Sequence, residues 1–289
     1  MDRSTGIVRW EERPSLRRPV LIAAFEGWND AGDAATSAAR YLARTWEART
    51  FARFDPEEFY DFTSTRPQVR LVNGETRQID WPDNEWQAAP VPGGSHDIVF
   101  LHGVEPQLRW RTFCQSVVDI VKESSVEMVF TLGALLADVP HSRPVRVSGS
   151  ATNRDLVDRL HLQRSRYEGP TGIVGVLHES LARAGVPSAS LWASVPHYVS
   201  QTPSPKAALA LVERTAQLLG ARVEPLELQI AASAYERQVT EVVEGDDDVA
   251  AYVRRLEQAD DDEGADPNTV MTGDALADEV ERFLRDPDI

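Results

Sequence analysis

Short apolar runs alternate with amphipathic segments through most of the chain. The runs are rich in β-branched residues, as is typical of buried strands, and they span residues 19–25, 97–103, 126–132 and 188–195. The amphipathic segments repeat apolar residues at helical spacing and span residues 34–45, 107–124, 172–185 and 204–220. Alternating strands and helices predict an α/β domain with a largely parallel sheet flanked by helices.

One segment departs from this alternation. Asn73 and Gly74 stand between two runs of alternating apolar and polar residues in 69–81. Asn-Gly accepts the positive φ angles of a type I′ turn, so the pattern predicts a β-hairpin. An antiparallel hairpin inserted in the α/β domain makes the predicted sheet mixed.

Two further segments are less regular. Residues 81–94 contain Trp81 and Trp86 among polar residues and prolines, which predicts a long polar loop. Residues 144–152 predict a second hairpin or a short strand, followed by a helix that begins near Asn153.

The character of the chain changes after residue 223. We therefore expect an α/β core domain over residues 1–223 and an acidic helical extension over residues 224–289. The extension predicts helices at 224–244, 247–259 and 273–286, with a solvated loop at 260–268. Their apolar stripes need a surface to pack on, which is either the core, another helix of the extension or a neighbouring chain.

Charge also distinguishes the extension from the core. The net charge of the chain is −16, and residues 244–289 hold 16 acidic residues and four arginines, a net charge of −12. The remaining residues have a net charge of only −4. An acidic chain of this kind is not expected to bind nucleic acid nonspecifically.

Other features of the composition narrow the class of protein. The single cysteine, Cys114, cannot form an internal disulfide, and it lies in a predicted helix, where we expect a buried apolar role. No apolar stretch approaches the roughly 18 residues needed to cross a bilayer, and the first residues lack a signal sequence. We therefore expect a cytoplasmic protein without membrane association.

Common catalytic and cofactor-binding motifs do not occur. The chain has no Walker A motif, dinucleotide fingerprint, nucleophile elbow or H-E-x-x-H motif. Its six histidines are scattered, with no pair at i, i+4, so we expect no metal site and no cofactor. We assign no catalytic residue, and the sequence favours a protein that is not an enzyme.

The stretch FEGWNDAGDAAT, directly after the first strand, holds the first group of candidate site residues. Asp30 or Asp33 could cap the following helix, where the positive end of the helix dipole stabilises an acid. Alternatively, Glu26, Trp28, Asn29 and Asp30 line a cleft at the carboxyl edge of the sheet. A loop that already carries acids suits a polar or cationic group better than a phosphate.

Three later loops contain further candidates, each with a purely structural alternative. His141 and Arg143 lie in a Pro-bounded loop and could bind a carboxylate or phosphate, or make internal bonds. Thr171 stands at a glycine-rich turn whose backbone N–H groups could hold an oxyanion, with Glu168 in reach; the glycines equally suit close helix packing. His197 and Tyr198 follow another buried strand, so they are also expected at the carboxyl edge of the sheet, where ligand sites usually lie.

Together these motifs resemble a known family. FEGWNDAGDAAT, LGALLADVPHSRP, YEGPTGIVGVL and ASVPHYV, in this order, resemble the proteasome assembly chaperone 2 family in its actinobacterial branch, over residues 15–220. The resemblance implies an α/β core similar to the phosphorylase/hydrolase fold, and self-association, for which a trimer is one arrangement. Eukaryotic relatives help to assemble proteasome α rings. The family has no agreed catalytic motif, so no catalytic residue is implied.

Two hypotheses follow. The first is a homo-oligomeric assembly or binding protein whose acidic extension binds a proteasome-related partner. The second is a small-ligand-binding protein or a hydrolase- or phosphorylase-like enzyme, with a pocket at the carboxyl edge of the sheet. Fold resemblance alone does not decide between them.

Overall fold

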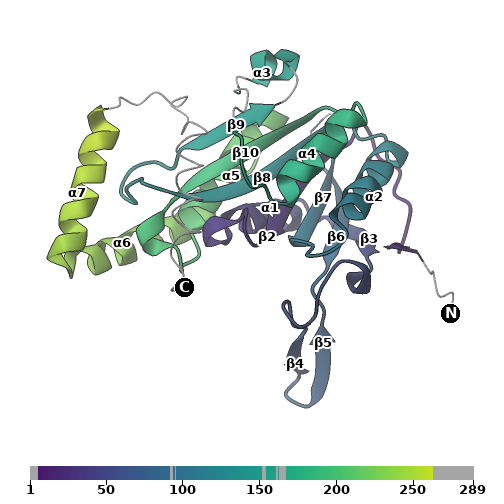
Figure 1. The fold of residues 1–289 in the computed structure, drawn as a ribbon, viewed down its shortest axis with the longest axis horizontal. Coiled ribbons are helices and arrows are strands. Elements are labelled where there is room, and N and C mark those ends of the chain that lie inside the picture. The colour runs from purple at the N-terminus through teal and green to yellow at the C-terminus, as the bar shows by residue number, and fades with distance from the viewer. Residues whose placement is uncertain are drawn as a thin grey trace.

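The main sheet has eight strands among the described residues. A computed structural model describes residues 6–91, 94, 96–151, 154–160, 162 and 167–262. The sheet has the order β1-β3-β6-β7-β2-β8-β10-β9 (Figure 1). Its strands are β1 (Val8–Trp10), β2 (Val20–Glu26), β3 (Arg49–Phe54), β6 (Asn84–Pro90), β7 (Asp97–Val104), β8 (Met128–Ala137), β9 (Val147–Ala151) and β10 (Ser188–Pro196).

The four central strands form the parallel part of this sheet. β2 pairs in parallel with β7 and β8, and β8 pairs in parallel with β10. The flanking strands β6 and β9 are antiparallel to their central neighbours. The predicted mixed, largely parallel α/β fold is therefore confirmed, and the four expected strands are its centre.

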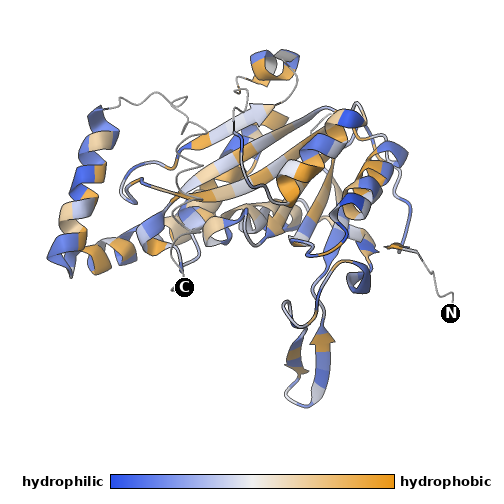
Figure 2. Ribbon diagram, in the orientation of Figure 1, coloured by the Kyte–Doolittle hydropathy of each residue, from blue (hydrophilic) through white to orange (hydrophobic). Residues whose placement is uncertain are grey.

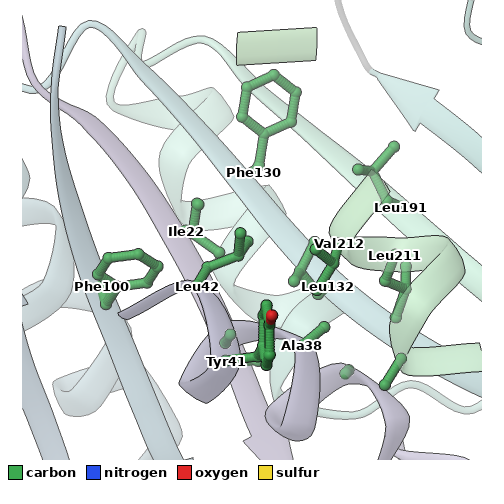
Figure 3. Close-up of a cluster of buried hydrophobic side chains, with 14 of the residues drawn as sticks. Ile22, Ala38, Tyr41, Leu42, Phe100, Phe130, Leu132, Leu191, Leu211 and Val212 are labelled. Carbon is green, nitrogen blue, oxygen red and sulfur yellow. The ribbon is translucent and has the colours of Figure 1, made fainter. Parts of the chain in front are cut away.

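Helices cover both faces of the sheet. α1 (Ala34–Thr45) and α5 (Pro205–Leu219) pack on one face, and α2 (Trp110–Glu123) and α4 (Ile173–Arg183) pack on the other (Figure 1). α3 (Arg154–Leu160) follows β9. Figure 3 shows how side chains of the central strands meet those of α1 and α5, with Ile22, Leu42 and Leu211 in one apolar cluster.

The expected polar loop at residues 81–94 is wrong in its first half, because residues 84–90 form β6. This strand pairs with β3 and with β7. Its Trp86 is fully buried and contacts the rings of Phe51 and Phe54, so an indole that resembled a loop residue is a core residue. Polar residues alternate with apolar ones there because the strand has one partly solvated face.

The hairpin prediction is confirmed. β4 (Gln68–Val72) pairs with β5 (Thr76–Asp80) in a separate two-stranded sheet. Asn73 and Gly74 have φ angles of 54° and 76°, which are the positive values that a type I′ turn requires. The hairpin projects from the body of the molecule (Figure 1).

Two helices of the extension are present among the described residues. α6 (Leu226–Glu244) lies against α5, and α7 (Asp247–Asp262) turns away from it after Gly245 (Figure 1). Tyr235, Val239, Val243 and Val253 form a small apolar cluster between α6 and α7. The third expected helix, residues 273–286, lies outside the described residues.

The expected loop at 260–268 is corrected at its start, since α7 continues through Asp262. Aspartates in the last turn of a helix oppose the helix dipole. In this protein Asp260 and Asp261 instead pair with Arg146 and Arg143 of the core, which favours the longer helix.

The two tryptophans of segment 81–94 give a matched test of this fold. Trp86→Ala should lower the free energy of unfolding by about 3–5 kcal/mol, because it leaves a large cavity in the core. Trp81→Ala removes a half-exposed ring that contacts Phe62, and it should cost less than about 1 kcal/mol. Urea unfolding measures both, and equal losses would contradict the burial of Trp86.

Candidate functional site

The loops with the candidate residues meet at one edge of the sheet. β2 ends at Glu26, β8 at Ala137 and β10 at Pro196, and these three strands run in the same direction. The carboxyl ends of parallel strands lie at the same edge, which is the usual position of ligand sites in α/β proteins. The side chains there fall into two groups.

The first group belongs to the turn after β2. Asp30 is buried, and its Oδ1 accepts the backbone N–H of Ala35 at 2.6 Å. Its Oδ2 accepts the hydroxyl of Thr36. Asp30 therefore caps α1, whereas Asp33 makes no side-chain cap bond to this helix. Burial raises the pKa of Asp30 to about 6, although the hydrogen bonds from Thr36 and Ala35 oppose that rise.

Asn29 joins this turn to two other elements. Its carbonyl oxygen accepts the N–H of Ala134 in β8 at 2.9 Å. Its side chain packs so closely on Gly172 that a Cβ at residue 172 would lie 2.1 Å from Asn29 Nδ2. The glycine at the start of α4 is therefore required for close packing, which was one of the two interpretations of this turn.

A carboxylate of the chain occupies the N-terminus of α4. Glu105, which the sequence interpretation missed, accepts the N–H of Ile173 at 2.7 Å. Its position directly after the strand that contains residues 97–103 was the available signal. The proposed oxyanion position beside Thr171 thus already has an acidic neighbour, while Thr171 and Glu168 are exposed.

Two side chains of the first group point to solvent. Trp28 has 47% of its surface exposed. Glu26 forms an ion pair with Arg40 of α1. These residues remain candidates for a ligand contact at the rim of the edge.

The second group surrounds His141. Tyr198, in the short helix η3 (His197–Val199), accepts the backbone N–H of His141 at 2.7 Å. His141 Nδ1 lies 2.8 Å from the Tyr198 hydroxyl, and Nε2 lies 3.0 Å from the hydroxyl of Thr240 in α6. The Thr240 hydroxyl donates to the carbonyl of Glu236, so it accepts from Nε2–H, and neutral His141 accepts the Tyr198 proton at Nδ1.

The environment of this pair favours the neutral forms. Burial, and then the nearby Lys206, lower the pKa of His141. Burial raises the pKa of Tyr198. His197 lies beside the pair, with its Nδ1 3.0 Å from Asp138 Oδ1 and its ring against Tyr252 of α7.

Basic side chains of the core face the acids of the extension. Arg143 forms two hydrogen bonds with Asp261, at 3.0 and 2.8 Å, and Arg146 pairs with Asp260. Lys206 of α5 contacts Glu236 of α6. Arg146 and Lys206 were not among the sequence candidates, because their acidic partners, Asp260 and Glu236, belong to the extension and are distant in sequence.

The structure therefore places eight of the ten candidates in two groups at this edge of the sheet, while Thr171 and Glu168 are exposed on the segment before α4. Glu26, Trp28, Asn29 and Asp30 belong to a capped strand-to-helix turn. The helices of the extension contact the other group, which consists of His141, Arg143, His197 and Tyr198. A small hollow borders His141 and Arg143.

Two kinds of feature are missing from the described residues. Within residues that the structure describes, no three His, Cys, Asp or Glu side chains gather in a way that could hold a metal ion. None of the described helices is long and apolar enough to cross a membrane.

Comparisons with known proteins agree on one family. Residues 24–243 match the family model described as the PAC2 family. A crystal structure of a PAC2 family protein from Streptomyces avermitilis is 48% identical, with a TM-score of 0.75, and the match covers 81% of this chain and 99% of that one. No match was found among the curated proteins.

Two further structures extend the comparison. The proteasome-assembly chaperone homologue of Mycobacterium tuberculosis is 46% identical, with a TM-score of 0.74 over 81% of this chain and 99% of that one. PbaB of Pyrococcus furiosus, described as an archaeal proteasome activator, is 19% identical, with a TM-score of 0.67 over 81% of this chain and 97% of that one, and shows the shared fold alone.

The cap at Asp30 gives a test of the first group. Asp30→Ala should lower the free energy of unfolding by about 1–2 kcal/mol, since the Ala35 and Thr36 N–H groups lose their acceptor. Asp30→Asn keeps an acceptor oxygen and serves as the control. Urea unfolding of the three proteins measures the difference, and equal stability of the alanine and asparagine variants would contradict the cap.

The pH dependence of the same variants carries a definite sign. The pKa of Asp30 is about 6 in the folded protein, above its ordinary value of 3.8, so the folded state takes up this proton first as the pH falls. The stability of the wild type relative to Asp30→Asn should therefore rise as the pH falls from 7 through 6 toward 4. Unfolding measured across this pH range checks the prediction, and a relative stability that falls would overturn it.

Proposed function

The chain belongs to the PAC2 family, and from this premise we propose that it is a homo-oligomeric protein-binding factor that acts on a proteasome-related partner. A relative 46% identical is described as a proteasome-assembly chaperone homologue, which supports the choice of partner. A closed ring such as a trimer is an arrangement that fits self-association of this kind.

One observation carries the proposal, and it is the exposed apolar face of the β4–β5 hairpin. Val69 faces Ile79 across the hairpin, and Leu71 lies on the same face two residues farther along β4. Val69 and Leu71 are 57% and 58% exposed, and Ile79 is also exposed. Figure 2 shows hydrophobic stretches beside hydrophilic ones along this projecting hairpin.

An isolated hairpin with this composition needs a partner. Two-stranded hairpins are at best marginally stable in water without further packing. Soluble monomers also rarely present contiguous apolar surface on a projecting element. The opposite face of the hairpin carries Gln68, Arg70 and Gln78, with Arg70 bonded to Gln78 and Asp80, and its one apolar residue is Val72, so the apolar face is the one with Val69, Leu71 and Ile79, where Arg77 stands opposite Leu71.

The alternative function, a small-ligand pocket or a hydrolase- or phosphorylase-like site, has less support. Asp30, Asn29 and Glu105 are engaged in bonds or close packing that shape the strand-to-helix turns. His141 and Tyr198 bond to each other and to α6. Protein binding through a projecting surface needs none of these groups to be free.

The hairpin offers a test with a matched control. Leu71→Glu/Ile79→Glu places two carboxylates on the apolar face, and it should weaken both self-association and capture of purified proteasome α subunits by more than about tenfold, because a partner that covers this face would have to strip water from both carboxylates. Native mass spectrometry measures oligomer mass and bound subunits together.

The control adds the same charge to the opposite face. Gln68→Glu/Gln78→Glu should keep the mass and the capture of the wild type, because these side chains lie on the polar face of the hairpin. If both double variants behave like the wild type, the hairpin is not the docking surface and the proposal loses its main support.

A further inference from the structure

The loop between β8 and β9 presents a row of groups that favour carboxylates. Ser142, Arg143 and Arg146 follow one another on this loop, and Lys206 lies beside it, donating to the carbonyl of His141. Arg143 and Arg146 are strong hydrogen-bond donors with a planar fork that suits carboxylates.

In this structure, one face of α7 supplies the carboxylates. Glu257 accepts from the Ser142 hydroxyl, Asp260 pairs with Arg146, and Asp261 pairs with Arg143. These three acids stand at positions i, i+3 and i+4, so they share one face of the helix. The loop therefore binds one face of α7 through three carboxylates.

The attachment of α7 to this loop is mostly polar: besides the three carboxylates, the Tyr252 hydroxyl donates to Asp138 at 3.0 Å, and the Arg146 and Asp260 side chains of the better covered ion pair are 26% and 21% exposed. Among the described residues of α7, Val253 is the one that is buried. It packs on α6 rather than on the loop. The Arg143 and Asp261 side chains are 35% and 62% exposed, and exposed ion pairs contribute little to stability. Moreover, Asp260 and Asp261 lie in the last turn of α7, where the helix dipole disfavours acids.

Part of the loop surface is not filled by α7. A hollow of about 10 Å³, room for about one water molecule, is lined by residues that include Val139, Pro144, Val145 and Pro196 beside Arg143 and Arg146. A single methyl or hydroxyl group on a side chain flanked by acids would fill this hollow, and the acids would still reach the arginines.

We propose that the loop of residues 138–146, together with Arg146 and Lys206, is a binding site for an acidic helix of a partner protein, and that α7 occupies this site in cis until the partner displaces it. This surface is separate from the hairpin face, so the inference stands whether or not the hairpin binds proteasome subunits. The occupant is inferred from charge complementarity and from the side chains of α7 that now occupy the site.

A different protein fits this role better than a second copy of the chain. The α7 of a second copy would make the same contacts that α7 makes in cis, where the short connection at Gly245 and Asp246 gives it a high effective concentration. Exchange between copies would therefore add no contact at the loop. A partner helix that also fills the hollow adds contacts that α7 lacks.

The test loosens α7 in the full-length protein. Glu257→Gln/Asp260→Asn/Asp261→Asn removes the three carboxylates that face the loop. The probe is a fluorescent, alanine-rich helical peptide with glutamates at i, i+3 and i+4. Fluorescence anisotropy should show about tenfold tighter binding to this variant than to the wild type, because the competing ion pairs are lost.

Two control variants isolate the site. Glu12→Gln/Glu47→Gln/Glu75→Gln removes the same charge from exposed positions outside α6 and α7, and it should bind the peptide like the wild type. Adding Arg143→Gln/Arg146→Gln to the loosened variant should abolish the gain. A peptide with lysines in place of the glutamates should not bind.

Three results would overturn the proposal. One is equal peptide binding by the wild type and the loosened variant. Another is binding that survives the loss of Arg143 and Arg146. The third is a larger oligomer for the loosened variant than for the wild type, seen by native mass spectrometry without peptide, since it would mean that α7 exchanges between copies. None of these results involves the hairpin, so failure of this inference is distinguishable from failure of the proposed function.

Discussion

Parallel pairing of β7, β2, β8 and β10 is the constraint on which the rest of this structure depends. It directs the strand ends toward one edge, so segments far apart in the chain meet there. The turn after β2 is then fixed from both sides, because Asp30 caps α1 and Asn29 bonds to β8. The same edge carries the loop on which α7 rests. The extension is therefore placed by the core, through the packing of α6 on α5, the ring contacts of Tyr252 with His197 and Tyr198, and the ion pairs of α7 with the loop.

The sequence predicted the central strands and the hairpin because their signals are local. A buried strand appears as an apolar run, and Asn73-Gly74 specifies its own turn. β6 was missed because most of its residues are polar or small and it ends at Pro90, and because its place in the sheet depends on pairing with β3 and β7. Similarly, the helical state of Asp260 and Asp261 depends on arginines more than a hundred residues away, which no local pattern reveals.

The sequence predicted which loops carry the candidate residues, but not how these loops contact one another. Strand ends predicted that His141 and Tyr198 would lie at the carboxyl edge, and the structure shows them in contact. Glu105 and Lys206 were missed because their roles arise from elements that meet only in the fold. The division of the chain at residue 223 stays a prediction, and the contact between α5 and α6 links the two proposed parts.

Hydrogen exchange of the wild-type protein at increasing concentration tests the central claim, that the exposed apolar face of the hairpin is a protein-docking surface, most directly. A hairpin that stands alone in water opens readily, whereas one whose apolar face is covered opens rarely. The account predicts that the amides of β4 and β5 become protected as the oligomer forms or as proteasome α subunits are added. Rapid exchange of these amides under every condition, with the core strands protected, would contradict it.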